Sequence, residues 1–227
     1  MLGTIVNFFA IVAGSLIGLL FRRGIPEKYK NTVMNGIALA VVLIGLMSAL
    51  KTEQMLLLIF SLVIGSVIGE FFRIEDRLEA LGKWIEARMG NYGGNVARGF
   101  VAASLIFCVG SLAIVGALES GLTGNHDKLF AKSVLDGISS IVFASTMGIG
   151  VIFSSLTVFV YQGLITIAAG FVKDFLTEDV IREMSAIGGL LIMALGFNLL
   201  ELKKIKAGNM LPAILIPVFY YIGQILY

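Results

Sequence analysis

Charge, cysteine and histidine are all scarce in this chain of 227 residues. Charged side chains make up 14% of the sequence against 58% apolar ones, and a soluble domain of that composition would have too little polar surface to cover itself. The single cysteine, Cys108, rules out an internal disulfide and a cluster of thiolate metal ligands within one chain. The composition therefore excludes a soluble globular domain and a thiolate metal centre.

Sequence motifs of catalysis and of nucleic-acid binding are missing as well. The chain has no nucleotide-binding loop, no HExxH, no GxSxG, and no arrangement of Ser, His and Asp that would support nucleophilic catalysis. His126 has only Asp127 and Glu119 near it as further metal ligands, where a site needs three or four, so a polar turn is the simpler interpretation. Basic residues form no stripe. We expect a protein that is not an enzyme, uses no cofactor and binds no nucleic acid.

Long runs without any charge are what the chain has in abundance. They cover residues 1–21, 31–50, 54–69, 99–118, 137–172, 184–200 and 207–227. About 20 helical residues cross the ~30 Å hydrocarbon core of a bilayer. The fifth run could reach ~54 Å as one helix, so it must fold back, and Gly148 and Gly150 are the weakest point for a helix. The sequence predicts an all-α, polytopic transmembrane helical bundle of about eight spans, at 4–21, 32–50, 54–72, 98–118, 130–147, 151–172, 183–200 and 209–227.

The distribution of lysine and arginine predicts the orientation of these spans. The first apolar run lacks a basic start and a cleavage site, and Arg22 and Arg23 follow it directly, so we expect a retained first helix. With the N-terminus outside, the inner loops hold twelve basic residues and the outer loops five, which favours both termini outside. If 130–147 were instead a re-entrant hairpin, the count would be eleven inside against six outside. Both arrangements stay open, with eight spans preferred.

The chain also resembles itself at an offset of 151 residues. The stretch from Ile25 to Gly45 aligns without a gap on the stretch from Leu176 to Gly196, although a chance match of two apolar hairpins is an equal alternative. A true duplication would make one transmembrane domain of four parts: a three-span repeat at 1–72, a cytoplasmic amphipathic linker helix at 73–97, a central helix pair at 98–150 and a second three-span repeat at 151–227. The two repeats would have opposite orientations, as in many secondary transporters.

The only long polar stretch, Phe71–Met89, has the spacing of an amphipathic helix. Its apolar residues recur every three or four positions, and Trp84 lies beside them. A helix of this kind lies in the headgroup plane of the membrane or docks a partner protein, and the first interpretation is the simpler one.

Polar residues inside the spans are the candidate functional residues, because each is costly in lipid unless it faces protein or water. Asp136 stands about two turns inside its helix; pairing with Lys132 is its structural alternative. Glu119 closes a helix at the end where its charge opposes the macrodipole. We expect Asp136 and Glu119 to couple transport to an ion or proton, with neutral ligands from Ser139, Ser140, Ser155, Gln162 and Asn198. Asn7 and Asn35 are further amides that could line a path.

The residues of the central region carry a resemblance to a known family. Three segments are involved, Phe107–Leu122, Lys132–Ser140 and Tyr161–Gly163, together with the Met-Leu-Gly-Thr start. They resemble the YdfK/YqgA-like family of bacterial inner-membrane proteins, a domain of unknown function, over nearly the whole chain. The resemblance implies a multi-span fold in the bacterial plasma membrane and no particular substrate.

Taken together, the sequence predicts a small secondary transporter or ion-permeation protein for a small solute or cation, surrounded by lipid. A chain of 24.3 kDa is small for a transporter, so a homodimer is expected. The alternative is a non-transporting membrane scaffold or sensor that binds a partner through the 71–89 helix, with Asp136 merely paired.

Overall fold

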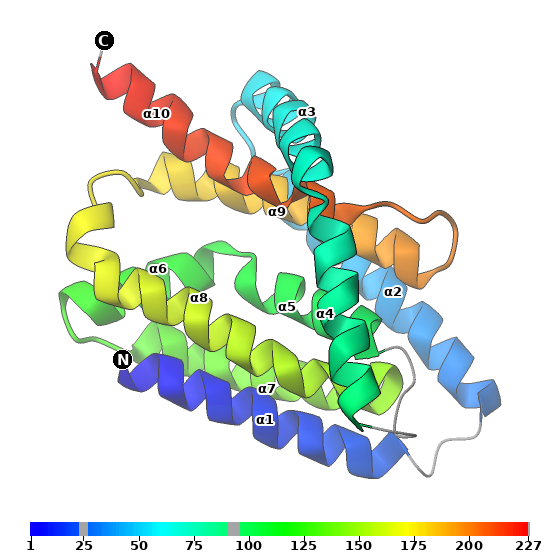
Figure 1. The fold of residues 1–227 in the computed structure, drawn as a ribbon. Helices are drawn as coiled ribbons and strands as arrows, with labels where there is room; N and C mark the ends of the chain where they lie inside the picture. The colour runs from blue at the N-terminus through cyan, green and yellow to red at the C-terminus, as the bar shows by residue number, and fades with distance from the viewer. Residues whose placement is uncertain (23–26, 90–95, 227) are drawn as a thin grey trace. The chain divides into compact units, whose positions relative to one another are not determined.

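The regular structure of this protein is helical throughout the part that the computed structural model describes, residues 1–22, 27–89 and 96–226 (Figure 1). The helices in chain order are α1 (Leu2–Arg22), α2 (Glu27–Ala49), α3 (Met55–Phe72), α4 (Ile74–Met89), α5 (Val96–Cys108), α6 (Ser111–Leu122), α7 (Asp127–Met147), α8 (Gly150–Val172), α9 (Glu178–Leu199), the 3₁₀ helix η2 (Ala207–Leu215) and α10 (Ile216–Leu226). The all-α prediction is confirmed. The prediction that the amphipathic segment forms a helix is also confirmed, and this helix is α4.

Six of the described helices, α1, α2, α3, α7, α8 and α9, are long and apolar enough to cross a membrane. The predicted span 98–118 is bent by 60° between α5 and α6, at Gly110, whose φ of +131° suits glycine. The predicted last span is divided into η2 and α10, because Pro212 and Pro217 cannot donate to the helical hydrogen-bond ladder. The predicted break near Gly148 is confirmed, since α7 ends at Met147 and α8 begins at Gly150. About eight segments are therefore present, and two of them are broken.

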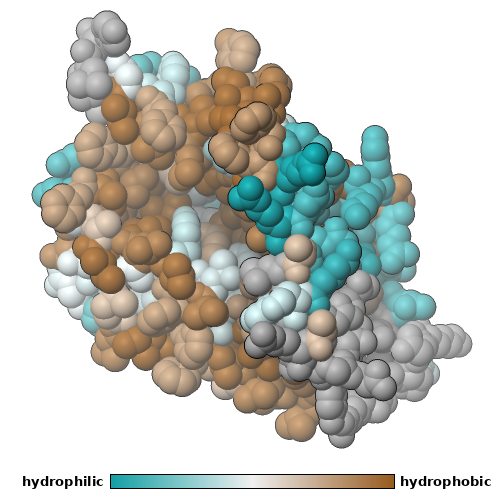
Figure 2. All heavy atoms as spheres, viewed as in Figure 1, coloured by the Kyte–Doolittle hydropathy of each residue, from teal (hydrophilic) through white to brown (hydrophobic). Residues whose placement is uncertain are grey.

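The long helices are polar or small on their buried side and apolar on their exposed side. On α8 the exposed stripe is Leu156, Val160, Leu164, Ile167 and Phe171, with Phe171 83% exposed, whereas Ser154, Ser155, Gln162 and Thr166 are buried. Hydrophobic residues cover most of the visible face in Figure 2, and hydrophilic residues gather over α4. A soluble protein shows the reverse pattern, so these helices present their apolar faces to lipid. This is a multi-pass membrane protein.

The described chain divides into two compact units. The first holds residues 1–33, 78–108 and 112–171, and its central contact is between α1 and α7. Gly14 and Gly18 of α1 lie so close to the carbonyls of Gly137 and Ile141 that no Cβ would fit. Small residues at four-residue spacing permit this approach of two transmembrane helices. Gly3 lies against Leu129, so α1 and α7 run in the same direction.

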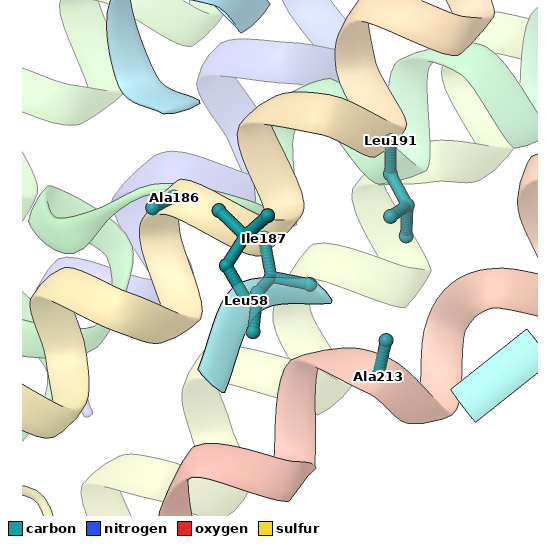
Figure 3. Packing of buried hydrophobic residues seen from close by; sticks show 5 residues of the cluster. All are labelled: Leu58, Ala186, Ile187, Leu191 and Ala213. Carbon is teal, nitrogen blue, oxygen red and sulfur yellow. The ribbon is translucent and has the colours of Figure 1, made fainter. Parts of the chain in front are cut away.

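The second unit holds residues 34–77, 109–111 and 172–227. Its buried apolar cluster joins α3, α9 and η2 through Leu58, Ala186, Ile187, Leu191 and Ala213 (Figure 3). Helix α9 is the central element of this unit, since most of its residues are buried. The predicted boundaries at residues 72, 97 and 150 stay a prediction.

Candidate functional site

Three helices of the first unit carry buried polar side chains that meet one another. Asn7 lies on α1, Lys132 and Asp136 lie one turn apart on α7, and Gln162 lies on α8. Asn7 and Gln162 are fully buried, and Lys132 and Asp136 are each 6% exposed. We call these four residues the polar site. It brings together two residues predicted as ligands, Asp136 and Gln162, and two that the sequence presented only as a structural partner and as a further amide.

The centre of the polar site is an ion pair within the membrane-spanning part of α7. Lys132 Nζ lies 2.8 Å from Oδ1 and 2.7 Å from Oδ2 of Asp136. Asn7 Nδ2 donates to Oδ2 of Asp136 at 3.0 Å and to Oε1 of Gln162 at 3.2 Å. The attraction between the two charges offsets part of the cost of burying each of them. The two charges of the pair sum to zero, and Gln162 is joined to the pair through Asn7.

Several buried polar atoms around the polar site have no hydrogen-bond partner among the residues that the structure describes. They are Asn7 Oδ1, Gln162 Nε2, Thr4 Oγ1 and Thr166 Oγ1. Thr4 lies one turn before Asn7 on α1, and Thr166 lies one turn after Gln162 on α8. Because α8 runs back after the α7–α8 break while α1 follows α7, both threonines lie toward the same end of the unit. An unmet buried polar group costs about 1–3 kcal/mol, so the site has unused capacity to bind a polar ligand or water.

Glu119, the second predicted coupling carboxylate, lies apart from this network. It pairs with Lys128 at 3.1 Å, and Asn125 Nδ2 lies 3.4 Å from its Oε1. Its side chain is 26% exposed, close to the loop between α6 and α7. In the same region Ser120 Oγ lies 2.9 Å from Nδ1 of His126. Glu119 therefore lies near the C-terminal end of α6 and makes no described hydrogen bond or ion pair with the polar site.

The predicted serine ligands bond mainly to their own helices. Ser140 Oγ donates to the carbonyl of Gly137 at 2.8 Å, and Ser155 Oγ donates to the carbonyl of Ile152 at 2.6 Å. Both serines are buried, whereas Ser139 is half-buried. Their hydroxyl protons are thus in use, although each oxygen keeps capacity to accept.

Asn198 lies in the second unit, where it closes a loop. Its Nδ2 donates to the carbonyl of Ile205 and its Oδ1 accepts from the backbone N–H of the same residue, both at 2.7 Å. This pairing ties the end of α9 to the segment before η2. Of the residues predicted as ligands, Asn198 is the one whose described contacts are those of a turn. Asn35, on α2, is exposed.

Sequence analysis missed a second buried carboxylate, Glu183 on α9. It is fully buried, accepts a short hydrogen bond from the hydroxyl of Thr52 and another from the backbone N–H of Glu53 at 2.9 Å, and lies 3.5 Å from Nε of Arg182. It fastens the α2–α3 turn to α9. In the sequence, Glu183 stands directly before the apolar run 184–200 and therefore looked like the boundary residue of a span. In the structure α9 begins five residues earlier, so Glu183 lies inside the helix.

Near the other end of α3, Glu70 takes part in an exposed polar cluster. Lys206 Nζ lies 2.9 Å from Glu70 Oε1, and Asn209 Nδ2 donates to Oε2 of Glu70 at 2.6 Å. The hydrogen bond to Glu70 raises the pKa of Lys206, so this lysine stays charged.

Among the described residues, no group of three or more His, Cys, Asp or Glu side chains is placed to hold a metal ion.

Comparison with known proteins gives the chain a family. Residues 2–222 match the family described as "Protein of unknown function (DUF554)". The chain is 37% identical to "Uncharacterized membrane protein YdfK" of Bacillus subtilis (strain 168), covering 96% of this chain and 94% of the relative. It is 28% identical to "Uncharacterized protein YqgA" of Escherichia coli (strain K12), covering 95% and 94%. No solved structure matches. The predicted resemblance is confirmed: this multi-pass membrane protein belongs to the DUF554 family.

Proposed function

We propose that this protein is a small secondary transporter or ion-permeation protein of the bacterial plasma membrane, and that the polar site couples the movement of a small solute or cation to ion or proton binding. The observation that carries the proposal is the buried Lys132–Asp136 pair with its two amides. Ionisable residues inside membrane spans are costly, and they often mark ion or proton paths. No enzymatic role is part of this proposal.

The structural alternative for the pair is weaker, because a neutral pair of apolar residues would be at least as stable. Replacing a buried ion pair by apolar residues of similar volume is often neutral or stabilising by about 1–4 kcal/mol. The pair here is further accompanied by Asn7 Oδ1 and Gln162 Nε2, which lack partners. A purely structural network would be expected to satisfy these atoms. The incomplete bonding favours a site that is filled and emptied.

An internal repeat would support transport, and the packing of α2 against α9 favours one. A Cβ on Gly45 would lie 2.6 Å from the carbonyl oxygen of Gly189, and a Cβ on Gly196 would lie 3.0 Å from that of Ala38. The offset of 151 residues carries Gly45 onto Gly196 and Ala38 onto Gly189. Under this offset, the contact of Gly45 with Gly189 therefore corresponds to the contact of Gly196 with Ala38, with the two helices exchanged. Antiparallel helices whose contacts exchange in this way are related by a two-fold axis across them, as expected of inverted repeats.

The first unit carries an independent indication at the same offset. The buried positions of α1 are Gly3, Thr4, Asn7, Ile11, Gly14, Ser15 and Gly18. The positions 151 residues later, on α8, are Ser154, Ser155, Val158, Gln162, Ile165, Thr166 and Ala169, all buried except the half-buried Ile165. Helix α2 begins at Glu27 and α9 at Glu178, which are also 151 residues apart. Helices α2 and α9 thus begin at equivalent residues, and α1 and α8 turn equivalent positions inward.

The residues of the polar site have separate roles in this proposal. Asp136 exchanges a proton or cation, Lys132 balances its charge, and Asn7 and Gln162 orient the carboxylate and offer their free amide atoms to the solute. Glu119 contributes at the mouth of the path, and Ser140 and Ser155 contribute acceptor oxygens. Both chain ends face outside, and the 24.3 kDa chain acts as a homodimer.

The experiment is the thermal stability of the purified full-length protein in detergent, measured from pH 5 to 8 and with NaCl, KCl or MgCl₂. A ligand present at 100 times its dissociation constant adds about 2.7 kcal/mol to stability. We expect a pH or ion response in the parent and its loss in Asp136→Asn. Asp174→Asn, in the exposed segment after α8, is the matched control and should respond as the parent does.

Two results would reject the coupling role. In one, the parent responds to no cation and shows no pH dependence; in the other, Asp136→Asn keeps the full response. Either would favour the scaffold alternative, in which α4, with Trp84 55% exposed, binds a partner.

A further inference from the structure

We propose that the polar site binds a small monocarboxylate together with one proton. This inference rests on the transport role proposed above and names the class of solute. It follows from the unused hydrogen-bonding groups and from the charge of the site.

The unused groups are mainly donors. Among the described residues, Lys132 Nζ hydrogen-bonds only Asp136, and an ammonium carries three N–H groups, so at least one is unused there. Gln162 Nε2 adds two hydrogens without an acceptor. Within the described part of the polar site, Asn7 Oδ1 is the unmet group limited to accepting, while the hydroxyls of Thr4 and Thr166 can donate or accept. Charge-assisted N–H donors beside amide N–H donors are suited to the oxygens of a carboxylate.

The charge of the site then requires a proton. Lys132 and Asp136 sum to zero, so a carboxylate added to the intact pair would leave a net negative charge in a low-dielectric region, which is costly. If Asp136 takes a proton from water, an O–H bond forms on its carboxyl group and the pair becomes a cation. Lys132 is then free to bind the carboxylate of the solute, and the net charge returns to zero. One proton therefore enters with each carboxylate.

Asp136 is the group that can supply this proton linkage. On its own helix it faces Lys132. From α1 the amide of Asn7 donates to it, and the amide of Gln162 on α8 accepts from Asn7. The thiol of Cys108 on α5 lies within electrostatic range of both Lys132 and Asp136, and Tyr161 on α8 lies within range of Cys108. Ordinary thiols and phenols carry no charge near neutral pH.

The test is the dissociation constant of sodium formate for the purified full-length protein in detergent, obtained from the formate dependence of its melting temperature between pH 5.5 and 8. Formate stays ionised throughout this range, and NaCl at equal ionic strength is the comparison. Where Asp136 loses its proton, we expect the dissociation constant to rise about tenfold per pH unit, as uptake of one proton per anion requires. NaCl should give no comparable shift.

Variants test whether formate binding depends on the proton of Asp136 and on the charge of Lys132. Asp136→Asn leaves Lys132 free at every pH, so it should bind formate without pH dependence. The double variant Lys132→Met, Asp136→Asn keeps the site neutral and should lose formate binding altogether. Asp174→Asn, on the exposed segment after α8, should behave as the parent.

The proposal is overturned if formate does not stabilise the parent, which would indicate buried water only, or if chloride acts equally. It is also overturned if Asp136→Asn keeps the pH dependence of formate binding. This test is independent of transport. Formate binding without ion flux in liposomes would reject the transport role and keep the site, whereas ion flux without formate binding would reject the solute class alone.

Discussion

Phe8 and Phe159 pack edge to face, with ring centroids 5.7 Å apart and an angle of 70° between the rings. They are also 151 residues apart, the offset at which the sequence resembles itself. A residue that contacts its own repeat equivalent lies on the axis that relates the two copies, so α1 and α8 would be related by an axis between these rings. The proposed repeat does not hold beside these rings: Asn7 bonds Gln162, whereas the positions 151 residues away from them, Val158 and Ile11, are buried and apolar.

The close packing of α2 on α9 gives a prediction about Gly45. Its Cβ would lie 2.5 Å from the backbone nitrogen of Met193, so Gly45→Ala must push the helices apart, at about 1–3 kcal/mol. Gly36, on the same helix, has nothing within 4 Å of its Cβ position. Gly36→Ala should therefore raise stability by about 0.5–1 kcal/mol, because alanine loses less conformational entropy in a helix. Melting temperatures in detergent compare the two, and equal effects would contradict the packing of α2 on α9.

The Lys132–Asp136 pair predicts that a single substitution lowers the stability of the protein and that a second substitution restores it. Lys132→Met leaves a buried carboxylate without its cation and should cost about 3–5 kcal/mol. Adding Asp136→Asn removes that charge and should restore most of the stability. The measurement is the melting temperature of both variants in detergent at pH 7. A double variant no more stable than Lys132→Met would contradict a buried pair.

Glu183 is predicted to matter for stability in the second unit. Glu183→Ala would leave the hydroxyl of Thr52 and the backbone N–H of Glu53 without an acceptor, and we expect a loss of about 2–4 kcal/mol. Glu178→Gln, at the exposed start of the same helix, should cost less than about 1 kcal/mol. Thermal unfolding of both variants in detergent checks this, and similar losses would reject the role of Glu183 as a buried clamp.

The distribution of basic residues predicts the orientation. In a Cys108→Ala background, cysteines placed at Leu2 and Gln224 should react with a membrane-impermeant maleimide in intact cells. A cysteine at Lys83 on α4 should react only after permeabilisation. A C-terminal cysteine that also needs permeabilisation would support the re-entrant alternative for 130–147.

Much of the fold could be predicted because a bilayer imposes a length on each apolar run. The break between α7 and α8 follows from two nearby glycines in a run too long for one span. The bend at Gly110 could not be predicted, since its surroundings are as apolar as those of an unbroken helix. The division of the last span could have been noticed from Pro212 and Pro217, which interrupt an otherwise continuous run.

The candidate site was predictable only in part, for a physical reason. Asp136 stands out because a carboxylate is costly inside a span, whatever surrounds it. Asn7, which bonds Asp136, lies 129 residues away from it in the chain, and Gln162 bonds Asn7 across 155 residues, so only tertiary packing selects these two amides from the others. Asn198, which looked equivalent by sequence, lies at a helix end and bonds a loop.

The most direct test of the coupling role of Asp136 is ion flux in proteoliposomes. An inside-negative potential would drive H⁺, Na⁺ or K⁺ inward, and the inward gradient of lactate would drive an electroneutral entry of H⁺. Glycine, lactate and glucose are placed outside as candidate solutes. We expect the parent and Asp174→Asn to carry at least one of these ions faster than protein-free liposomes, and Asp136→Asn to fall to the protein-free rate. Equal flux in the parent and in Asp136→Asn, or no flux above protein-free liposomes in either, would contradict the proposed role of the polar site.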